Sequence, residues 1–201
     1  VYIHEKIYDK VLNGAVEKLS KLKMGNALDE KSDIGAIISE EQLKRTLYYM
    51  DIAKKNSSTK ILHGGNQSKG GDYKDGFYYE PTLLSGLPVS SPVCQEEVFG
   101  PVACAIPFKS FDEVMESAND TQFGLSAVLW TKDLSRALQF VDEIEAGFVQ
   151  VNQCVAPRAN VSYGGIKMSG LGKEYAFDSM MNHFTQSKTI LINRGKSNLD
   201  V

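Results

Sequence analysis

Two adjacent carboxylates stand beside an aromatic side chain in the octet QEEVFGPV, residues 95–102. A carboxylate such as that of Glu97 can accept two hydrogen bonds from vicinal hydroxyls, as on a ribose, and these charge-assisted bonds are strong. The ring of Phe99 can pack against a flat heterocycle, and Gly100 and Pro101 fix the backbone that follows. The pattern indicates a site for a sugar-linked heterocycle, whereas composition alone would favour a solvated acid pair at a turn.

The glycine-rich run GGIKMSGLGK at residues 164–173 raises the alternative of a phosphate-binding loop. A Walker loop needs Gly, four residues and then Gly-Lys-Ser/Thr, but Leu171 follows Gly170 here. A dinucleotide fingerprint that starts at Gly170 needs a third glycine where Tyr175 stands. We therefore interpret the glycines as close backbone turns that lead into a helix.

The cysteines and histidines do not have the spacing of a metal site. Cys94, Cys104 and Cys154 form no C-x-x-C pair, and the histidines form no H-x-x-x-H pair, so we expect no bound metal. An odd, sparse set of cysteines is typical of a reducing cytosol, so we expect a cytoplasmic protein.

A cysteine nucleophile would need a neighbouring base and an oxyanion donor. Cys104 lies in an apolar segment, where a small buried hydrophobe is the ordinary role. Cys94 precedes the acid pair, whose negative field is expected to raise the pKa of its thiol. Cys154, in a predicted loop, is the best candidate of the three, and a hydrolase that pairs Cys154 with His183 is one alternative function.

The composition is that of an ordinary globular protein, with 42% hydrophobic and 23% charged residues in a chain of 201. The formal net charge is -3, with acids and bases interspersed, which argues against a nucleic-acid partner. No apolar run approaches the roughly 18 residues that span a bilayer, so we expect no membrane insertion. The N-terminus has no signal-peptide pattern and does not begin with Met, so we expect a part of a longer protein.

Strand and helix patterns alternate along the chain, and Ser39-x-x-Gln42 and Ser110-x-x-Glu113 are capping boxes that open two helices. The predicted helices are residues 8–22, 40–50, 111–118, 134–141 and 174–184, and the predicted strands are residues 1–3, 61–62, 103–108, 127–130, 148–151 and 189–192. Several strands are continuously apolar, which predicts an α/β fold with a largely parallel sheet flanked by helices. We expect one domain over residues 1–188, followed by a strand and tail at residues 189–201.

Four motifs carry a resemblance to a known family: EEVFGP at residues 96–101, ANDTQFGLSA at 118–127, GFVQVN at 147–152 and YGGIKMSGLGKE at 163–174. In order and spacing they resemble the NAD(P)-dependent aldehyde dehydrogenase superfamily, and the resemblance covers nearly the whole chain. It implies an aldehyde dehydrogenase catalytic-domain-like fold, of which this sequence would be the C-terminal portion.

The resemblance also implies roles for single residues. Glu97 would hold the hydroxyls of the nicotinamide ribose of NAD or NADP, and Phe99 would pack beside the nicotinamide. Residues 152–163 would form the substrate-anchoring loop. The substrate-binding residues implied there are Asn152, Val155, Arg158 and Tyr163, with Val155 and Arg158 at the tunnel entrance and Tyr163 near the reacting centre. The glycine-rich run would be structural and position the wall of the aldehyde tunnel.

Other parts of the family's pattern are absent from these residues. The family's nucleophilic Cys, its general-base Glu and its Rossmann-like cofactor domain all precede the strand at residues 1–3, so no catalytic residue is assigned here. In the complete enzyme, the resemblance implies that a thiolate attacks the aldehyde, hydride leaves for the nicotinamide, and water hydrolyses the thioester. This chain by itself is therefore expected to be inactive.

The resemblance further implies partners. In the family the C-terminal tail joins a neighbouring subunit's sheet, so we expect a homo-oligomer that acts on an aldehyde substrate. Arg158 at the tunnel entrance favours an acidic or phosphorylated aldehyde. The alternative function is a non-catalytic, stand-alone binding or assembly domain of the same fold.

Overall fold

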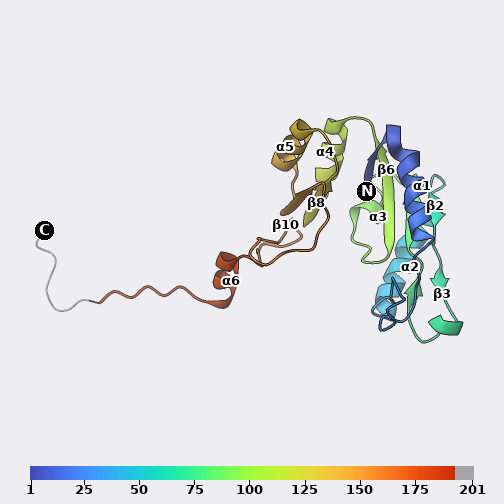
Figure 1. Ribbon diagram of the computed structural model, residues 1–201, viewed down its shortest axis with the longest axis horizontal. Coiled ribbons are helices and arrows are strands. Elements are labelled where there is room, and N and C mark those ends of the chain that lie inside the picture. The colour runs from blue at the N-terminus through green and yellow to red at the C-terminus, as the bar shows by residue number, and fades with distance from the viewer. Residues whose placement is uncertain (193–201) are drawn as a thin grey trace, which may run out of the picture. The chain divides into compact units, whose positions relative to one another are not determined.

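The computed structural model of the chain describes residues 1–192 (Figure 1), and the chain divides into two compact units, Val1–Thr121 and Gln122–Val201. The predicted domain over residues 1–188 covers most of both units, and its boundary stays a prediction. None of the helices described in residues 1–192 is both long and apolar enough to span a bilayer.

A four-stranded sheet forms the centre of the first unit, with strand order β1-β6-β5-β2. These strands are β1 (Tyr2–His4), β6 (Val102–Phe108), β5 (Thr82–Ser85) and β2 (Lys60–His63). Strand β6 runs parallel to both β1 and β5, and only the β2–β5 pair is antiparallel. The predicted α/β fold with a largely parallel sheet is thus confirmed.

The helices of the first unit follow the predicted order. They are α1 (Tyr8–Leu19), α2 (Glu40–Lys55), α3 (Pro92–Gln95) and α4 (Phe111–Asn119), with 3-10 turns η1 (Glu5–Ile7) and η2 (Gly71–Tyr73) and a small ribbon of β3 (Gln67–Ser68) and β4 (Tyr78–Tyr79). The capping box at α4 is complete, since Ser110 accepts from the Glu113 amide and the Glu113 carboxylate accepts from the Ser110 amide. Strands β3, β4 and β5 and helix α3 were not predicted.

The core of the first unit lies on both faces of the sheet. Leu83 of β5 packs in a cluster with Leu12 of α1, whereas Leu84 packs in a cluster with Met50 of α2. Successive residues of a strand point to opposite faces, so α1 and α2 cover opposite sides of β5. All four residues of β5 are buried as a result.

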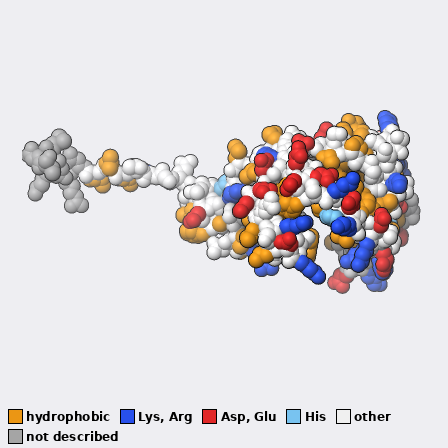
Figure 2. Space-filling model, turned by 90° about the horizontal axis from the view of Figure 1, so that it is seen from above, with side chains coloured by type: hydrophobic (Ala, Val, Ile, Leu, Met, Phe, Trp, Pro, Cys, Tyr) orange, Lys and Arg blue, Asp and Glu red, His pale blue; other side chains and the backbone are white. Residues whose placement is uncertain are grey.

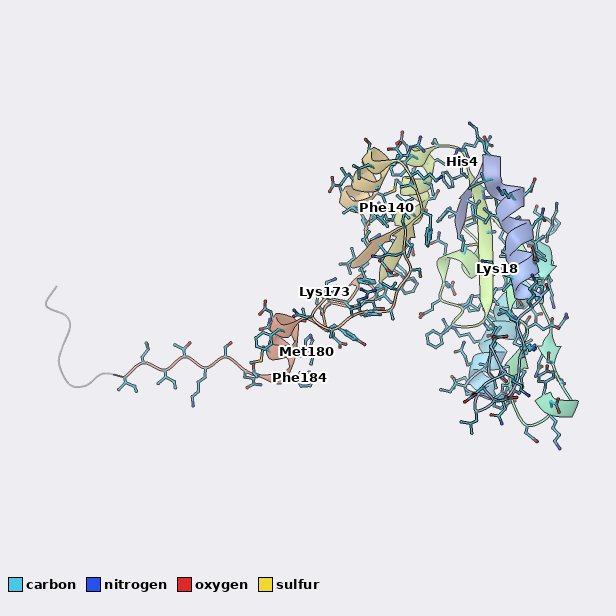
Figure 3. All side chains as sticks on the ribbon, viewed as in Figure 1. His4, Lys18, Phe140, Lys173, Met180 and Phe184 are labelled. Carbon is cyan, nitrogen blue, oxygen red and sulfur yellow. The ribbon has the colours of Figure 1, made fainter. Side chains whose placement is uncertain are left out.

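The second unit contains a β-α-β element and a short antiparallel pair. Its elements are β7 (Phe123–Gly124), β8 (Ser126–Leu129), α5 (Leu134–Glu143), β9 (Phe148–Val151), β10 (Ile166–Lys167) and α6 (Phe177–Phe184). Strands β8 and β9 are parallel, and β7 and β10 are antiparallel. Phe140 is the buried residue of α5, and Figure 3 labels its place on that helix.

Helix α6 begins at Phe177, three residues later than predicted. Glu174 is instead paired with Tyr163, since each amide donates to the other's carbonyl, at 2.7 Å from Glu174 and 3.0 Å from Tyr163. Tyr175 has a φ of +67°, which a helix does not accommodate. The helix therefore starts only after this bridge.

The strand predicted at residues 189–192 does not form within the described chain. Residues 189–192 have no regular structure, and the side chains of Ile190 and Leu191 are 65% and 92% exposed. The rest of the predicted tail, residues 193–201, lies outside the described residues. A strand needs a neighbour to pair with, and no described strand of this chain supplies one.

Candidate functional site

Helix α2 holds the backbone of the acidic turn at residues 96–101. The Gln42 side-chain amide donates to the carbonyl oxygens of Val98 at 3.0 Å and Phe99 at 2.7 Å. One helical turn later, the guanidinium of Arg45 donates from both Nε (3.0 Å) and Nη2 to the carbonyl oxygen of Glu97. Three consecutive carbonyls of the turn are therefore bonded to one face of the helix.

The two adjacent carboxylates have different surroundings. The phenol of Tyr49 donates a hydrogen bond of 2.7 Å to Glu96 Oε2, and Tyr49 itself is only 4% exposed. The Glu97 side chain is exposed, and no described residue gives its carboxylate a hydrogen bond or an ion pair. Glu96 is therefore attached to α2, whereas the acceptor oxygens of Glu97 are available to a ligand.

Phe99 presents its ring to solvent from a constrained backbone. Its φ is +52° and its side chain is 69% exposed. The next residue, Gly100, approaches α2 so closely that an added Cβ would lie 2.5 Å from Oγ1 of the buried Thr46. Only glycine fits between the turn and the helix without a shift of one of them.

The sequence signals for these contacts were only partly recognised. Ser39 does cap α2, with its hydroxyl accepting from the Gln42 amide at 3.2 Å, as predicted. The reciprocal arm of the predicted capping box is wrong, because the Gln42 side chain bonds to the 98–99 backbone instead. Gln42, Arg45 and Tyr49 stand at i, i+3 and i+7, a polar stripe on one helix face, and that spacing is the signal that could have identified them.

Asn152 directly follows β9, and both the oxygen and the nitrogen of its side-chain amide form hydrogen bonds with the backbone of one residue, Thr131. Its Oδ1 accepts from the Thr131 amide at 2.9 Å, and its Nδ2 donates to the Thr131 carbonyl at 2.8 Å. Its φ of +54° lies in the left-handed region, where Asn is among the best tolerated residues. Asn152 thus fixes where the following loop leaves the strand.

The next part of that loop is held by a residue that the sequence did not single out. Gln150 of β9 is 6% exposed, and its Oε1 accepts from the Val155 amide at 2.9 Å. The Val155 side chain is 36% exposed. A buried amide that bonds forward by five residues keeps the start of the loop folded against the strand.

Arg158 and Tyr163 differ in how firmly they are held. Arg158 is exposed, and its carbonyl accepts from the Val161 amide at 3.1 Å in a turn. The ring of Tyr163 makes edge contacts with Phe148 at 5.2 Å and with Tyr175 at 6.0 Å between ring centroids. Tyr163 is therefore fixed in an aromatic cluster, whereas the guanidinium of Arg158 has no recorded partner among residues 1–192 and can meet a ligand.

The structural interpretation of the glycine-rich run is confirmed. An added Cβ on Gly164 would lie 2.3 Å from the Gly172 carbonyl oxygen, and one on Gly165 would lie 2.6 Å from Cβ of Ser169. Lys173, labelled in Figure 3, donates from Nζ to the carbonyls of Gly164 at 2.8 Å and Gly165 at 3.2 Å. The glycines permit close backbone approaches, and the ammonium group joins them.

The thiols differ from expectation in one respect. A hydrogen bond from the Cys104 thiol lowers the pKa of Cys94, so the predicted upward shift is wrong. The same bond, together with burial, raises the pKa of Cys104.

Cys154 is exposed, and the described contacts include no hydrogen bond between Cys154 and His183. Within residues 1–192 no group of three His, Cys, Asp or Glu side chains could hold a metal ion.

The six predicted site residues divide between the two units. Glu97 and Phe99 belong to the first unit, where α2 brings them onto one short turn. Asn152, Val155, Arg158 and Tyr163 belong to the second, on the loop that follows β9. On the face that Figure 2 shows, acidic and basic side chains are interspersed.

Known proteins are similar to this chain in sequence and in fold. An aldehyde dehydrogenase of Rhodospirillum rubrum is 38% identical over 190 residues, which are 94% of this chain and 37% of that protein. Aldehyde dehydrogenase B of Escherichia coli K12 is 37% identical over the same shares of the two chains. A crystal structure of Staphylococcus aureus betaine aldehyde dehydrogenase in complex with NAD+ matches with a TM-score of 0.90 and 31% identity, covering 99% of this chain and 39% of that one.

These matches are partial in length but extend over almost the whole of this sequence. The chain spans little more than a third of the length of the curated relatives that it matches, namely 37% of each of the two proteins named above. A model of the aldehyde dehydrogenase family matches residues 1–190. The chain therefore belongs to the aldehyde dehydrogenase family.

Proposed function

We propose that this chain is the C-terminal portion of the catalytic domain of an enzyme that oxidises an aldehyde to a carboxylate with NAD or NADP. One observation carries the proposal furthest. The Glu97 carboxylate is exposed and has no partner among the described residues, while its backbone carbonyl is bonded to Arg45. A fixed backbone with a free carboxylate is what a ribose-binding group requires.

In this proposal Glu97 accepts hydrogen bonds from both hydroxyls of the nicotinamide ribose. The ring of Phe99, 69% exposed, packs beside the nicotinamide. When bound there, the nicotinamide would accept the hydride that the aldehyde carbon releases. The chain's own contribution is to orient the ribose, and thereby the ring, by two charge-assisted bonds from a fixed turn.

The loop at residues 152–163 is proposed to guide the aldehyde. Asn152 serves by holding the start of the loop, because both ends of its amide are already bonded to Thr131. Val155 supplies apolar surface and Tyr163 a fixed aromatic wall. Arg158 supplies a positive charge, which favours an acidic or phosphorylated aldehyde.

We assign no nucleophile and no general base to residues 1–201, so this stretch by itself is proposed to be inactive. The cytoplasmic location and the homo-oligomer expected from the sequence remain parts of the proposal. The odd, sparse cysteines support the first, and the exposed apolar residues at 190–192, which need covering, support the second.

The cofactor role is tested with Glu97→Gln in the complete dehydrogenase. The Kd for NAD and for NADP, measured by titration of protein fluorescence, is expected to rise about 10- to 100-fold, because a hydrogen bond to a charged group contributes about 1.5–3 kcal/mol. Glu116→Gln makes the same change on α4 and should leave both constants unaltered. An unchanged Kd in Glu97→Gln would contradict the proposed cofactor role of this turn.

The substrate class is tested separately with Arg158→Ala. The KM for acidic or phosphorylated aldehydes is expected to rise about tenfold or more, while the KM for neutral aldehydes stays the same. Steady-state nicotinamide reduction across a matched series of aldehydes measures the difference. Equal effects on charged and neutral aldehydes would remove Arg158 from the proposal.

A further inference from the structure

Tyr49 and Glu96 form a side-chain pair directly beside the proposed ribose-binding residue. The phenol donates to Glu96 Oε2 at 2.7 Å, and the Tyr49 ring belongs to the core cluster of the first unit. Arg45 lies over the same ring, 5.7 Å from its centroid, and also bonds to the Glu97 carbonyl. The phenol is thus held in place from the core side and from the helix surface.

The backbone at Glu96 turns this bond into an orientation for its neighbour. Glu96 has a φ of -108° and a ψ of 159°, an extended conformation. In extended backbone, successive side chains point to opposite sides. Because Tyr49 draws the Glu96 side chain toward α2, the Glu97 side chain must point away from it.

The exposure of the following residues shows the same alternation. Val98 is 8% exposed and packs in the core cluster, whereas Phe99 is 69% exposed. Val98 is thus directed inward by burial, and Glu96, although exposed, is directed to the same side by its bond to Tyr49, whereas Glu97 and Phe99 are the outward residues. Both groups of the proposed cofactor site depend on one inward–outward register.

We infer that Tyr49 is a positioning residue for nucleotide binding: its hydrogen bond fixes Glu96 inward and so directs Glu97 outward to the ribose. The inference rests on the proposed function of Glu97. It gives the two adjacent acids separate roles, with Glu96 as the anchor and Glu97 as the ligand-binding group. The bond to Glu96 raises the pKa of Tyr49. The phenol therefore keeps the proton that it donates to Glu96 at pH values where an ordinary tyrosine would lose it.

The first test is Tyr49→Phe in the complete dehydrogenase, with Tyr48→Phe as the matched control. Tyr48 neighbours Tyr49 on α2, but its side chain is 61% exposed. Tyr49→Phe is expected to raise the Kd and the KM for NAD about three- to tenfold, as the loss of one hydrogen bond allows, with a smaller change in kcat. Tyr48→Phe should change none of the three constants.

Two variants of the acceptor separate positioning from general loss of structure. Glu96→Gln keeps a carbonyl oxygen that can accept the phenol proton, so it should retain most of the affinity, whereas Glu96→Ala should match Tyr49→Phe. The double variant Tyr49→Phe, Glu96→Ala should be no weaker than either single variant, because both remove one interaction. Glu96 is exposed, so its replacement should not prevent folding.

A cofactor-free measurement completes the test. Hydrogen–deuterium exchange of the Glu96 amide, which donates to the Pro92 carbonyl at 2.8 Å, should speed up in Tyr49→Phe and in Glu96→Ala, and remain unchanged in Tyr48→Phe. A wild-type Kd in Tyr49→Phe, or a larger loss in Glu96→Gln than in Glu96→Ala, would overturn the inference. If Glu97→Gln itself leaves nucleotide binding intact, the proposed function fails; if only Tyr49→Phe is silent, the inference alone fails.

Discussion

Gln42 donates a 2.7 Å hydrogen bond to the carbonyl of Phe99, a residue whose φ is +52°. A non-glycine residue in the left-handed region costs about 1–3 kcal/mol and persists only where its surroundings compensate. The same amide also bonds to the carbonyl of Val98, so one side chain on α2 holds the peptide units on both sides of this residue. The conformation of the acidic turn is thus determined by a helix more than fifty residues earlier in the chain.

Replacing Gln42 with Ala should release this turn. Two carbonyl acceptors lose their protein partner, and the free energy of unfolding is expected to fall by about 1–2 kcal/mol, as measured by urea denaturation. Lys44→Ala on the same helix is the control, since the one pair recorded for its side chain within residues 1–192 is an exposed pair with Glu40. The interpretation is wrong if the two variants lose equal stability.

Gly100→Ala should destabilise the first unit by about 1–3 kcal/mol, because the new Cβ would meet Oγ1 of Thr46 at 2.5 Å. Gly14→Ala is the matched control: it lies within α1, where an added Cβ would meet nothing within 4 Å, and should gain about 1 kcal/mol. Adding Thr46→Ala to Gly100→Ala should recover part of the loss. Thermal and urea unfolding measure all of these variants, and a neutral Gly100→Ala would contradict the close approach.

Asn152→Ala should cost about 2 kcal/mol, because it removes two hydrogen bonds to Thr131 and places a residue that disfavours a positive φ at +54°. Asn152→Gly removes the same bonds but accepts the backbone conformation, so it should lose less. Comparison of the two unfolding free energies separates the bonds from the backbone. Equal losses would show that the backbone conformation contributes nothing.

Tyr79→Phe should stabilise the first unit by about 1 kcal/mol, since the buried Tyr79 hydroxyl has no hydrogen-bond partner among the described residues. Burial raises the pKa of Tyr79 from 10.0 to about 12. The folded pKa is above the unfolded one, so the stability due to the neutral phenol is fully present below pH 10.0 and is lost between pH 10.0 and about 12.

Urea unfolding of wild type and Tyr79→Phe at pH 8 and pH 11 measures both effects. The difference between the two proteins should widen at pH 11, because only the wild type loses the contribution of a neutral Tyr79. A constant difference at the two pH values would refute the alkaline linkage. Tyr48→Phe, at an exposed position on α2, serves as the control for removal of a tyrosine hydroxyl group.

Local pattern was sufficient for several elements. Strand β9 was predicted to the residue at 148–151, and helix α4 starts where its capping box predicted. These segments carry their own signal, either a run of apolar residues or a polar cap at fixed spacing, so no distant contact is needed to recognise them.

Strand β5 shows where local pattern fails. Its four residues, TLLS, stand between Pro81 and Gly86 and are too few to show a period. They form the most buried strand of the sheet because β6 and β2 pair with both edges, while α1 and α2 cover both faces. That environment consists of residues far away in the chain, so it follows from the packing of the folded unit and not from the local pattern.

A motif of six residues is local, so the amino-acid order was enough to indicate the family resemblance and to single out Glu97 and Phe99 as candidate cofactor contacts. It did not show that Gln42, Arg45 and Tyr49 hold that motif, since these contacts join residues that are 47 to 57 positions apart. Hydrogen bonds at that separation depend on how α2 packs against the sheet. The residue types determine which hydrogen bonds are chemically possible, and the packing of the helices and strands determines which of these bonds form.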